Sequence, residues 1–178
     1  MSDVLTIQVK QFKALSGDEY SEVLALCTRA FKRDYLPIMN TFEDTTHILG
    51  KMTDRLVTHV LWVTRWLQVG TLPPMRTAYV EAVATELNHR DKGFASETMK
   101  CVTREIQDFD IGALATGSPD FYARFGWQRW RGPLFTRTEK GLMPNPNEHG
   151  VMVLLLPKTP SIDLDAPLSA EWREGEIW

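Results

Sequence analysis

A short segment with a central glycine contains the residue types best suited to bind phosphate groups. It runs from Arg90 to Ala95, has the form R-x-x-G-x-A, and precedes a helix expected from about Ser96 to Asp108. Gly93 would let the backbone turn tightly, and the amides after it would point out of the helix N-terminus, where they bind a pyrophosphate well. On its spacing alone, however, Gly93 would equally suit an ordinary turn.

The elements that must position this segment alternate between strands and helices. Alternating apolar and polar residues predict a strand over 5–10, and Ser16 with Gly17-Asp18-Glu19 predicts the start of a helix. Along the chain, strands come before and after single helices, and this order indicates an α/β fold whose sheet has strands of mixed direction. The other expected elements are a loop or broken helix over 34–46, a hairpin over 47–52 and 56–63, strands over 76–85, 111–116, 127–136 and 150–156, a short helix over 119–125, a loop over 141–147 and an aperiodic tail over 157–178.

Composition favours a single globular domain over residues 1–178 and excludes several classes of partner. The chain is 43% hydrophobic and 24% charged, and its net charge of −3 is not accompanied by a basic run. Nucleic-acid binding is therefore not expected, whereas a cationic small molecule is compatible. No apolar stretch reaches about eighteen residues and no signal peptide is visible, so we expect no membrane association.

The cysteines, histidines and tryptophans are expected to be structural. Cys27 and Cys101 lie in predicted helices without a metal-ligand spacing or a neighbouring thiol, which favours a reducing, cytoplasmic location. The four histidines share no ligand spacing, so no metal site is expected; they are His47, His59, His89 and His149. Four of the six tryptophans are expected to fill the core or to form a contact in a homodimer: Trp62, Trp66, Trp127 and Trp130.

Two motifs in a fixed order resemble those of the GCN5-related N-acetyltransferase (GNAT) superfamily. The strand Tyr79–Thr85 leads into R-x-x-G-x-A, a helix follows, and Phe121–Trp127 then reads F-Y-x-x-x-G-W. The resemblance extends from about Val4 to Leu156. It implies the GNAT fold, a central mixed, mostly antiparallel sheet flanked by helices, and it implies acetyl-coenzyme A as co-substrate.

The resemblance also implies where acetyl-coenzyme A would bind. The strand that holds Glu81 would separate from its neighbour at a bulge, and an amide near Ala82 or Val83 would polarise the thioester carbonyl. The pantetheine arm would pair with main chain around Val83 and Thr85, and the pyrophosphate would lie on the amides of the helix N-terminus. The cofactor-binding residues expected are Val83, Thr85, Arg90, Gly93, Phe94, Ala95 and Ser96.

Acyl transfer to an amine requires a base for the ammonium proton and an acid for the leaving thiolate. Glu81 is the base candidate, because it is an acid within a strand of Val and Ala, where desolvation would raise its pKa. The alternative is a solvent-facing Glu81 without a role. Tyr122 is the acid candidate, because its counterpart in the superfamily's F-Y-x-x-x-G motif lies beside the thioester sulfur. The alternative is a tyrosine that only packs.

Several further segments resemble a narrower group, the aminoglycoside 2′-N-acetyltransferases. The matching segments are Phe31–Tyr35, Tyr79–Ala84, Phe125–Pro133 and Trp172–Trp178, whose W-R-x-G-D/E-x-W form is the most specific. The resemblance implies that the tail over 157–178 contributes to the substrate site and that carboxylates hold the drug's amines. The substrate-binding residues implied are Asp34, Glu81, Ala82, Thr116 or Ser118, Glu148, Glu176 and the terminal Trp178.

One departure from that family concerns the acceptor. Where relatives often have another acid, this chain has Leu36–Asn40, and Met39 would form an apolar wall. A buried ammonium without a partner is unfavourable there, so the departure favours a compact aminoglycoside of the kasugamycin kind. Glu43 and Asp44 lie nearby and could replace the missing acid.

Two other functions remain open from the sequence. The first is a GNAT acetyltransferase that acts on another small amine, an amino acid or a protein N-terminus, against which the tail argues. The second is a non-catalytic protein that binds acetyl-coenzyme A, against which the presence of both Glu81 and Tyr122 argues.

Overall fold

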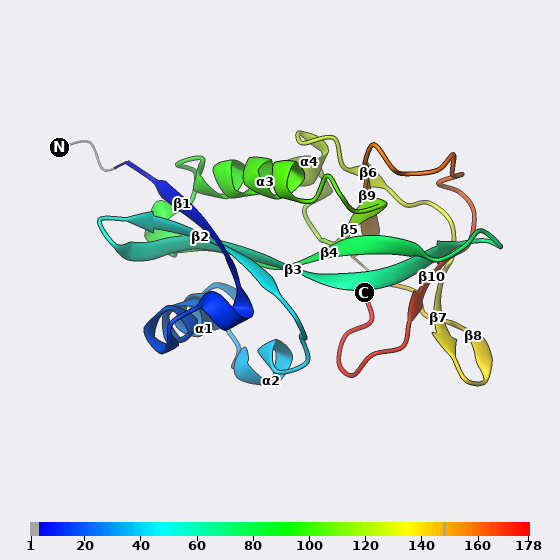
Figure 1. Ribbon diagram of the computed structural model, residues 1–178, viewed down its shortest axis with the longest axis horizontal. Helices are drawn as coiled ribbons and strands as arrows, with labels where there is room; N and C mark the ends of the chain where they lie inside the picture. The colour runs from blue at the N-terminus through cyan, green and yellow to red at the C-terminus, as the bar shows by residue number, and fades with distance from the viewer. Residues whose placement is uncertain (1–3, 148) are drawn as a thin grey trace. The chain divides into compact units, whose positions relative to one another are not determined.

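The computed structural model describes residues 4–147 and 149–178 (Figure 1). These residues form two compact units. The first unit runs to Val63 and resumes from Val80 to Arg104. The second comprises Thr64–Tyr79 and the chain from Glu105 onward. Two long strands, β3 (Arg55–Val69) and β4 (Met75–Thr85), each contribute residues to both units.

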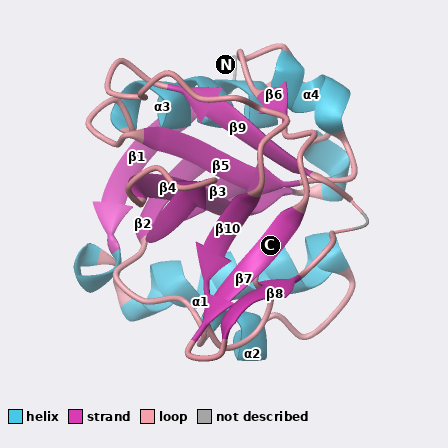
Figure 2. Cartoon of the chain, turned by 90° about the vertical axis from the view of Figure 1, so that its right-hand side faces the viewer, coloured by secondary structure: helices cyan, strands magenta, loops and turns pink. Residues whose placement is uncertain are grey.

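The first unit is a sheet with helices on both faces. Its strand β1 (Thr6–Gln11) pairs antiparallel with β2 (Thr46–Met52), which pairs antiparallel with the first part of β3. Figures 1 and 2 show α1 and α2 on one side of these strands and α3 on the other. The remaining elements of this unit are η1 (Phe12–Ala14), α1 (Gly17–Phe31), α2 (Leu36–Met39), η2 (Leu87–His89) and α3 (Phe94–Glu105).

Helix α1 begins where the sequence predicts because Ser16 and Glu19 form a capping box. The Glu19 amide donates to Ser16 Oγ, and the Ser16 amide donates to the Glu19 carboxylate, each at 3.1 Å. The same carboxylate binds Lys10 of β1 at 2.7 Å and Lys51 of β2 at 3.1 Å. The Lys10 hydrogen bond, followed by those from the Ser16 backbone and Lys51, lowers the Glu19 pKa to about 2. These contacts fix the first turn of α1 against β1 and β2.

The second unit is built on a mixed sheet with the strand order β6-β9-β5-β4-β3-β10-β7-β8. The pairs β4·β5 and β7·β10 are parallel, and β5·β9, β6·β9, β3·β10 and β7·β8 are antiparallel. In Figure 2 the short helix α4 lies beside β6. The elements introduced here are β5 (Ile111–Ala115), α4 (Pro119–Ala123), β6 (Gln128–Arg129), β7 (Leu134–Thr138), β8 (Gly141–Pro144), β9 (Val151–Leu155) and β10 (Leu168–Glu171).

Three expected segments differ from the observed elements. The single strand expected over 127–136 is divided into β6 and β7, because Gly132 lies against the backbone of another segment. A Cβ added at Gly132 would lie 1.9 Å from the Ala166 carbonyl oxygen, and Pro133 has no amide to donate to a ladder. The loop expected over 141–147 contains strand β8, and the tail without a period contains strand β10.

Three of the four tryptophans expected in the core or a dimer contact are buried. The exposed fractions are 7% for Trp62, 2% for Trp127 and 7% for Trp130. Trp66 differs, because 48% of it is exposed on β3. The three buried tryptophans pack in the core. The Trp66 side chain is exposed and is available for a contact with a second copy of the chain.

Candidate active site

The R-x-x-G-x-A segment forms the turn into α3. Asp91 and Gly93 have φ angles of 62° and 83°, in the left-handed region that favours glycine. The Gly93 carbonyl accepts a hydrogen bond from the Glu97 amide at 3.1 Å, so the preceding first-turn amides, those of 94–96, have no acceptor within the helix. Among the described residues, nothing lies within 4 Å of where a Gly93 Cβ would be. Open space and unpaired helix amides together suit a diphosphate that approaches the backbone.

The side chains of this segment are accessible in part. Arg90 is exposed at the turn, and the side chains from Phe94 to Ser96 are half-buried. The Phe94 ring stacks on His89, with 5.9 Å between the ring centroids. The turn therefore brings a cation, an aromatic face and helix amides together.

Strand β4 has an irregular backbone at Ala82. Its φ angle is 53° within an otherwise extended strand, a conformation that costs a residue with a side chain roughly 1–2 kcal/mol. Ala82 is 5% exposed, and the flanking Glu81 and Val83 are half-buried. Farther along the strand, Thr58 of β3 donates to the Ala84 carbonyl at 3.2 Å and lies 3.0 Å from the Thr85 hydroxyl. The strand therefore places Glu81, the base candidate, directly beside the irregular residue.

A row of buried hydrogen bonds leads to the Ala82 carbonyl, and we call its members Thr45, His47 and His59 the histidine chain. The Ala82 oxygen lies 3.0 Å from His59 Nδ1, His59 Nε2 lies 2.9 Å from His47 Nδ1, and His47 Nε2 lies 2.7 Å from Thr45 Oγ1. Both rings are fully buried. Burial lowers the pKa of His47 to about 4, and burial beside His47 lowers that of His59 to about 3. Both imidazoles are therefore neutral at pH 7.

This contact was not expected from the sequence, in which the four histidines share no ligand spacing. In the β2·β3 register His47 is opposite Leu61, and His59 is opposite Leu49. The two histidines are therefore diagonal neighbours on one face of the hairpin, close enough for long or ring side chains to meet. Two histidines at this offset in a predicted hairpin are the signal that could have revealed the pair.

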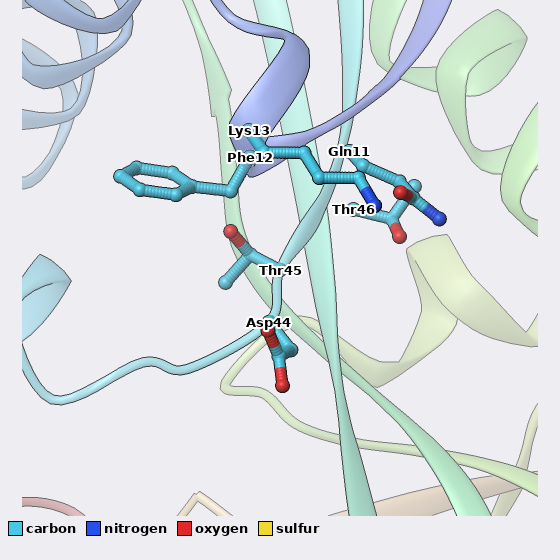
Figure 3. Close-up of a pocket in the computed structure, with 6 residues that line it drawn as sticks. All are labelled: Gln11, Phe12, Lys13, Asp44, Thr45 and Thr46. Atoms are coloured by element: carbon cyan, nitrogen blue, oxygen red, sulfur yellow. The ribbon is translucent and has the colours of Figure 1, made fainter.

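A pocket of about 280 Å³ opens at the Thr45 end of the histidine chain (Figure 3). The ring of Phe12 on its wall lies 6.4 Å from the His47 ring, and the Phe12 amide donates to the Thr45 carbonyl at 2.9 Å. Asp44, one of the two acids considered as a replacement near Met39, lines this pocket. The lining residues come from the end of β1, from η1, and from the loop that leads into β2 together with its first residue: Gln11, Phe12, Lys13, Asp44, Thr45 and Thr46.

In the second unit, Tyr122 of α4 is buried beside Thr116. The Tyr122 side chain is 9% exposed and forms a hydrogen bond with the Thr116 side chain. Burial raises the pKa of Tyr122 to about 12, so the phenol keeps its proton at neutral pH. The Ser118 amide donates to Thr116 Oγ1 at 2.9 Å, while Ser118 itself is exposed. The structure thus places Thr116, rather than Ser118, against the acid candidate.

In the second unit, Arg65 of β3 binds the end of the tail, residues 171–177. This role of Arg65 was not expected from the sequence. The Arg65 side chain is 2% exposed and donates to the Glu171 carboxylate at 3.2 Å, to the Glu171 carbonyl at 2.8 Å, and to the Ile177 carbonyl. Its guanidinium lies 5.1 Å from the Tyr79 ring centroid, and Arg173 lies 5.4 Å from the same centroid. One buried cation therefore fixes both ends of the segment from 171 to 177.

The acids expected to hold a drug occur in both units. Asp34 is exposed, and its carboxylate accepts the Leu36 amide at 3.1 Å at the start of α2. Met39 at the end of α2 is 5% exposed. In the tail, Glu176 is exposed and Trp178 is 7% exposed. Glu148 lies outside the described residues.

Neither a metal cluster nor a membrane-spanning helix occurs in the described part of the chain. Over 4–147 and 149–178, no three His, Cys, Asp or Glu side chains gather closely enough to hold a metal ion. None of the helices there is both long and apolar enough to cross a bilayer. Cys27 and Cys101 are buried, and the two are not joined by a disulfide.

Two sequence comparisons identify relatives of this chain. A family model described as an acetyltransferase (GNAT) domain matches residues 11–130. An aminoglycoside 2′-N-acetyltransferase from Mycolicibacterium fortuitum is 30% identical over 147 residues, which cover 76% of this chain and 75% of that protein. Together these matches show an acetyltransferase family, whose members use acetyl-coenzyme A.

Solved structures share the fold. The GNAT family N-acetyltransferase YhbS from Escherichia coli, in complex with CoA, superposes with a TM-score of 0.66 at 12% identity, over 96% of this chain and 92% of that one. Eis1 from Mycobacterium abscessus superposes with a TM-score of 0.61 at 18% identity over 73% of this chain, which spans about a third of Eis1 (32%). The mixed sheet, the turn into α3 and these matches agree: the chain has the GNAT fold and belongs to the GNAT family of acetyltransferases.

Proposed function

We propose that this protein transfers the acetyl group of acetyl-coenzyme A to the 2′-amine of an aminoglycoside and thereby confers resistance. The observation that carries the proposal is the 30% identity to an aminoglycoside 2′-N-acetyltransferase over three quarters of both proteins. The ordered tail that Arg65 holds supports it, because the W-R-E-G-E-I-W segment is the most specific part of the resemblance. We take residues 1–178 to act as one acetyltransferase domain, with residues 157–178 at the substrate site.

Acetyl-coenzyme A would be held by main chain from both β4 and α3. The first-turn amides of α3 and the exposed Arg90 would bind the pyrophosphate. Main chain around Val83 and Thr85 would pair with the pantetheine arm. An amide next to the irregular Ala82 would then polarise the thioester carbonyl.

Glu81 and Tyr122 would move the protons. Glu81 would accept a proton from the substrate ammonium, directly or through water, which frees the nitrogen lone pair for attack on the thioester carbon. As the carbon–sulfur bond breaks, Tyr122 would donate its phenolic proton to the sulfur, and the second proton lost from the attacking nitrogen would return to the Tyr122 oxygen through water, giving an amide and free coenzyme A. The pKa of about 12 supports Tyr122 as a donor, because the phenol is protonated before the reaction.

The acceptor would be recognised by carboxylates and by an apolar wall. Asp34, Glu81, Glu148, Glu176 and the Trp178 carboxylate would bind the drug's ammonium groups. Met39 is 5% exposed, so the proposed apolar wall is supported by the family resemblance of the segment around it and not by an exposed Met39 side chain. We therefore propose a compact, kasugamycin-type aminoglycoside as the preferred drug.

An acceptor screen tests the proposal directly. Purified protein is incubated with acetyl-coenzyme A and either kasugamycin, gentamicin, kanamycin, polyamines, amino acids or N-terminal peptides, and free thiol release is measured. We expect turnover of an aminoglycoside, with the acetyl group on the 2′-nitrogen by mass spectrometry and NMR. Turnover of the other amines alone would support a different GNAT substrate, and acetyl-coenzyme A binding without any turnover would support a non-catalytic role.

The Met39→Asp variant tests the drug preference. A carboxylate at this position would give a buried ammonium a partner, so kcat/KM for gentamicin and kanamycin should rise relative to kasugamycin. A parent enzyme that discriminates against kasugamycin, or a variant that gains nothing on the other drugs, would refute the preference.

A cytoplasmic homodimer completes the proposal. The buried Cys27 and Cys101, which are not joined by a disulfide, support a reducing compartment, and the exposed tryptophans Trp66 (48%) and Trp172 (64%) support a contact with a second copy. Light scattering during gel filtration should give twice the monomer mass. Trp66→Ser should lower that mass if the contact involves β3.

A further inference from the structure

The peptide unit that joins Ala82 to Val83 is held from one side by an imidazole. His59 Nδ1 lies 3.0 Å from the Ala82 carbonyl oxygen, and His59 is fully buried. A trans peptide is planar, so its carbonyl and its amide N–H point in opposite directions. A contact that fixes the Ala82 carbonyl therefore also fixes the direction of the Val83 N–H.

The hydrogen-bond roles along the histidine chain follow from this carbonyl. Because a carbonyl can only accept, His59 Nδ1 must hold the proton, and in a neutral ring His59 Nε2 must accept. His47 Nδ1 must then donate to His59 Nε2, and His47 Nε2 must accept the Thr45 hydroxyl proton. Each ring is thus restricted to its Nδ1-protonated tautomer, and Thr45 sets the direction of the row at the pocket end.

The two rings lie beside side chains from α1 and η1 and are out of contact with solvent. Cys27 of α1 lies with its sulfur 3.9 Å from His59 Nδ1, and burial raises the pKa of this thiol to about 12. Phe12 of η1 packs near His47. A neutral ring that donates to a strained, buried peptide stabilises that peptide, because leaving its carbonyl without a donor would carry a desolvation cost.

We propose that His59 is a positioning residue for acetyl transfer: its donated hydrogen bond holds the Ala82–Val83 peptide so that the Val83 amide is directed at the thioester carbonyl oxygen. His47 and Thr45 hold His59 in the tautomer that can donate. This inference rests on the proposed acetyl transfer at β4, and it needs no particular amine as acceptor.

The tautomers can be measured on the unmodified protein. Long-range ¹H–¹⁵N spectra at pH 7, assigned with single histidine variants, should show His47 and His59 protonated at Nδ1, with the exposed His149 as a reference ring in solvent. An Nε2-protonated His59 would overturn the inference. The measurement uses neither acetyl-coenzyme A nor an acceptor, so its outcome is independent of the proposed substrate.

Two substitutions at His59 separate donation from packing. His59→Asn keeps an N–H near the Nδ1 position, whereas His59→Leu fills space without a donor. One well-placed hydrogen-bond donor at a developing oxyanion raises kcat by about 10²–10³-fold. A Val83 amide that points away from the thioester oxygen should therefore lower kcat by about tenfold or more. We expect this loss in kcat for His59→Leu, with the KM for acetyl-coenzyme A within about threefold, and recovery of most of kcat in His59→Asn.

The matched control is Cys27→Ala. This substitution opens space beside the His59 ring but leaves the hydrogen bond from His59 to the Ala82 carbonyl. The kcat of Cys27→Ala should therefore stay within about threefold of the parent value. Equal losses in His59→Asn and His59→Leu, or a His59→Leu enzyme within about threefold of the parent, would overturn the positioning role. If the parent acetylates only amines other than aminoglycosides, the drug proposal is refuted, and the kcat values of the His59 variants can still be compared with that amine as acceptor.

Discussion

Tyr122 has the properties that a proton donor to sulfur requires, since it is buried, bonded to Thr116 and protonated at neutral pH. We predict that Tyr122→Phe lowers kcat by about 10²-fold or more, because a positioned general acid contributes about that factor. Far-ultraviolet circular dichroism should be unchanged. Tyr20→Phe, which removes a phenol from α1, is the matched control and should keep its kcat. A Tyr122→Phe kcat within a few-fold of the parent would mean that the tyrosine only packs.

Gly93 combines a left-handed φ of 83° with open space above its Cα. We predict that Gly93→Asp weakens acetyl-coenzyme A binding far more than drug binding, because the carboxylate would repel a pyrophosphate and block its approach. Gly93→Ala introduces the same backbone strain without the charge, so the difference between the two variants isolates the electrostatic part. Calorimetry should show the loss, and an unchanged affinity for acetyl-coenzyme A would remove this segment from the site.

Residues whose role depends on one continuous segment could be predicted from sequence. The turn at Gly93 and the short helix that carries Tyr122 follow from local patterns, and the structure shows both. His59 could not be assigned in that way, because its partners Thr45, His47 and Ala82 come from different parts of the chain. Their contact depends on strand register, and a shift by one residue would turn each side chain to the opposite face.

Among the elements, the end of the tail is bound by Arg65, a residue that lies more than a hundred positions earlier in the chain. We predict that Arg65→Lys loosens residues 171–177, because an ammonium cannot reproduce the directions of a guanidinium that contacts Glu171 and Ile177. Each hydrogen bond lost from a charged group would cost roughly 1.5–3 kcal/mol. Hydrogen exchange of this segment should accelerate, and the drug KM should rise while acetyl-coenzyme A binding is retained.

The matched control is Arg131→Lys, because the Arg131–Asp165 pair is largely exposed and such pairs contribute little. Unaltered hydrogen exchange of residues 171–177 in Arg65→Lys would show that the tail is held by other contacts.

The elements that sequence predicts well are those with a local reason to begin and end. Helix α1 has its capping box at Ser16 and Glu19, and β2 and β3 have apolar runs on both sides of a turn. Strand β8 is exposed at all four residues, so it has no apolar alternation, and β10 has only four residues. Both form because β7 offers partners, which is a tertiary effect that no periodicity encodes.

For the molecule as a whole, the buried histidine pair predicts loss of stability in acid. Folding lowers the pKa of His47 to about 4 and that of His59 to about 3, whereas the unfolded chain protonates near pH 6.5. The unfolded state therefore binds more protons as the pH falls below about 6.5, and the stabilising contribution present above that pH is lost progressively toward the folded-state values. Urea unfolding at pH 7 and pH 5 should show a loss of about 2 kcal/mol for each histidine.

The comparison that isolates this effect uses a His47→Asn/His59→Asn double variant, which should lose less stability than the parent between the same two pH values. His149→Gln, at an exposed position, is the matched control and should behave as the parent does. An equal pH dependence in the parent and the double variant would show that the pair is not the source.

Strand β10 lies between β3 and β7, although it follows both in the chain. Leu168 is opposite Val69 on one side and Leu134 on the other. During synthesis, β3 and β7 are therefore both complete before the strand that separates them exists. Both present an open edge in the interval, and such edges pair readily with other chains. A chaperone that shields nascent strands, or slower translation near residue 168, should raise the soluble yield of this protein more than that of a GNAT protein whose sheet closes in sequence order.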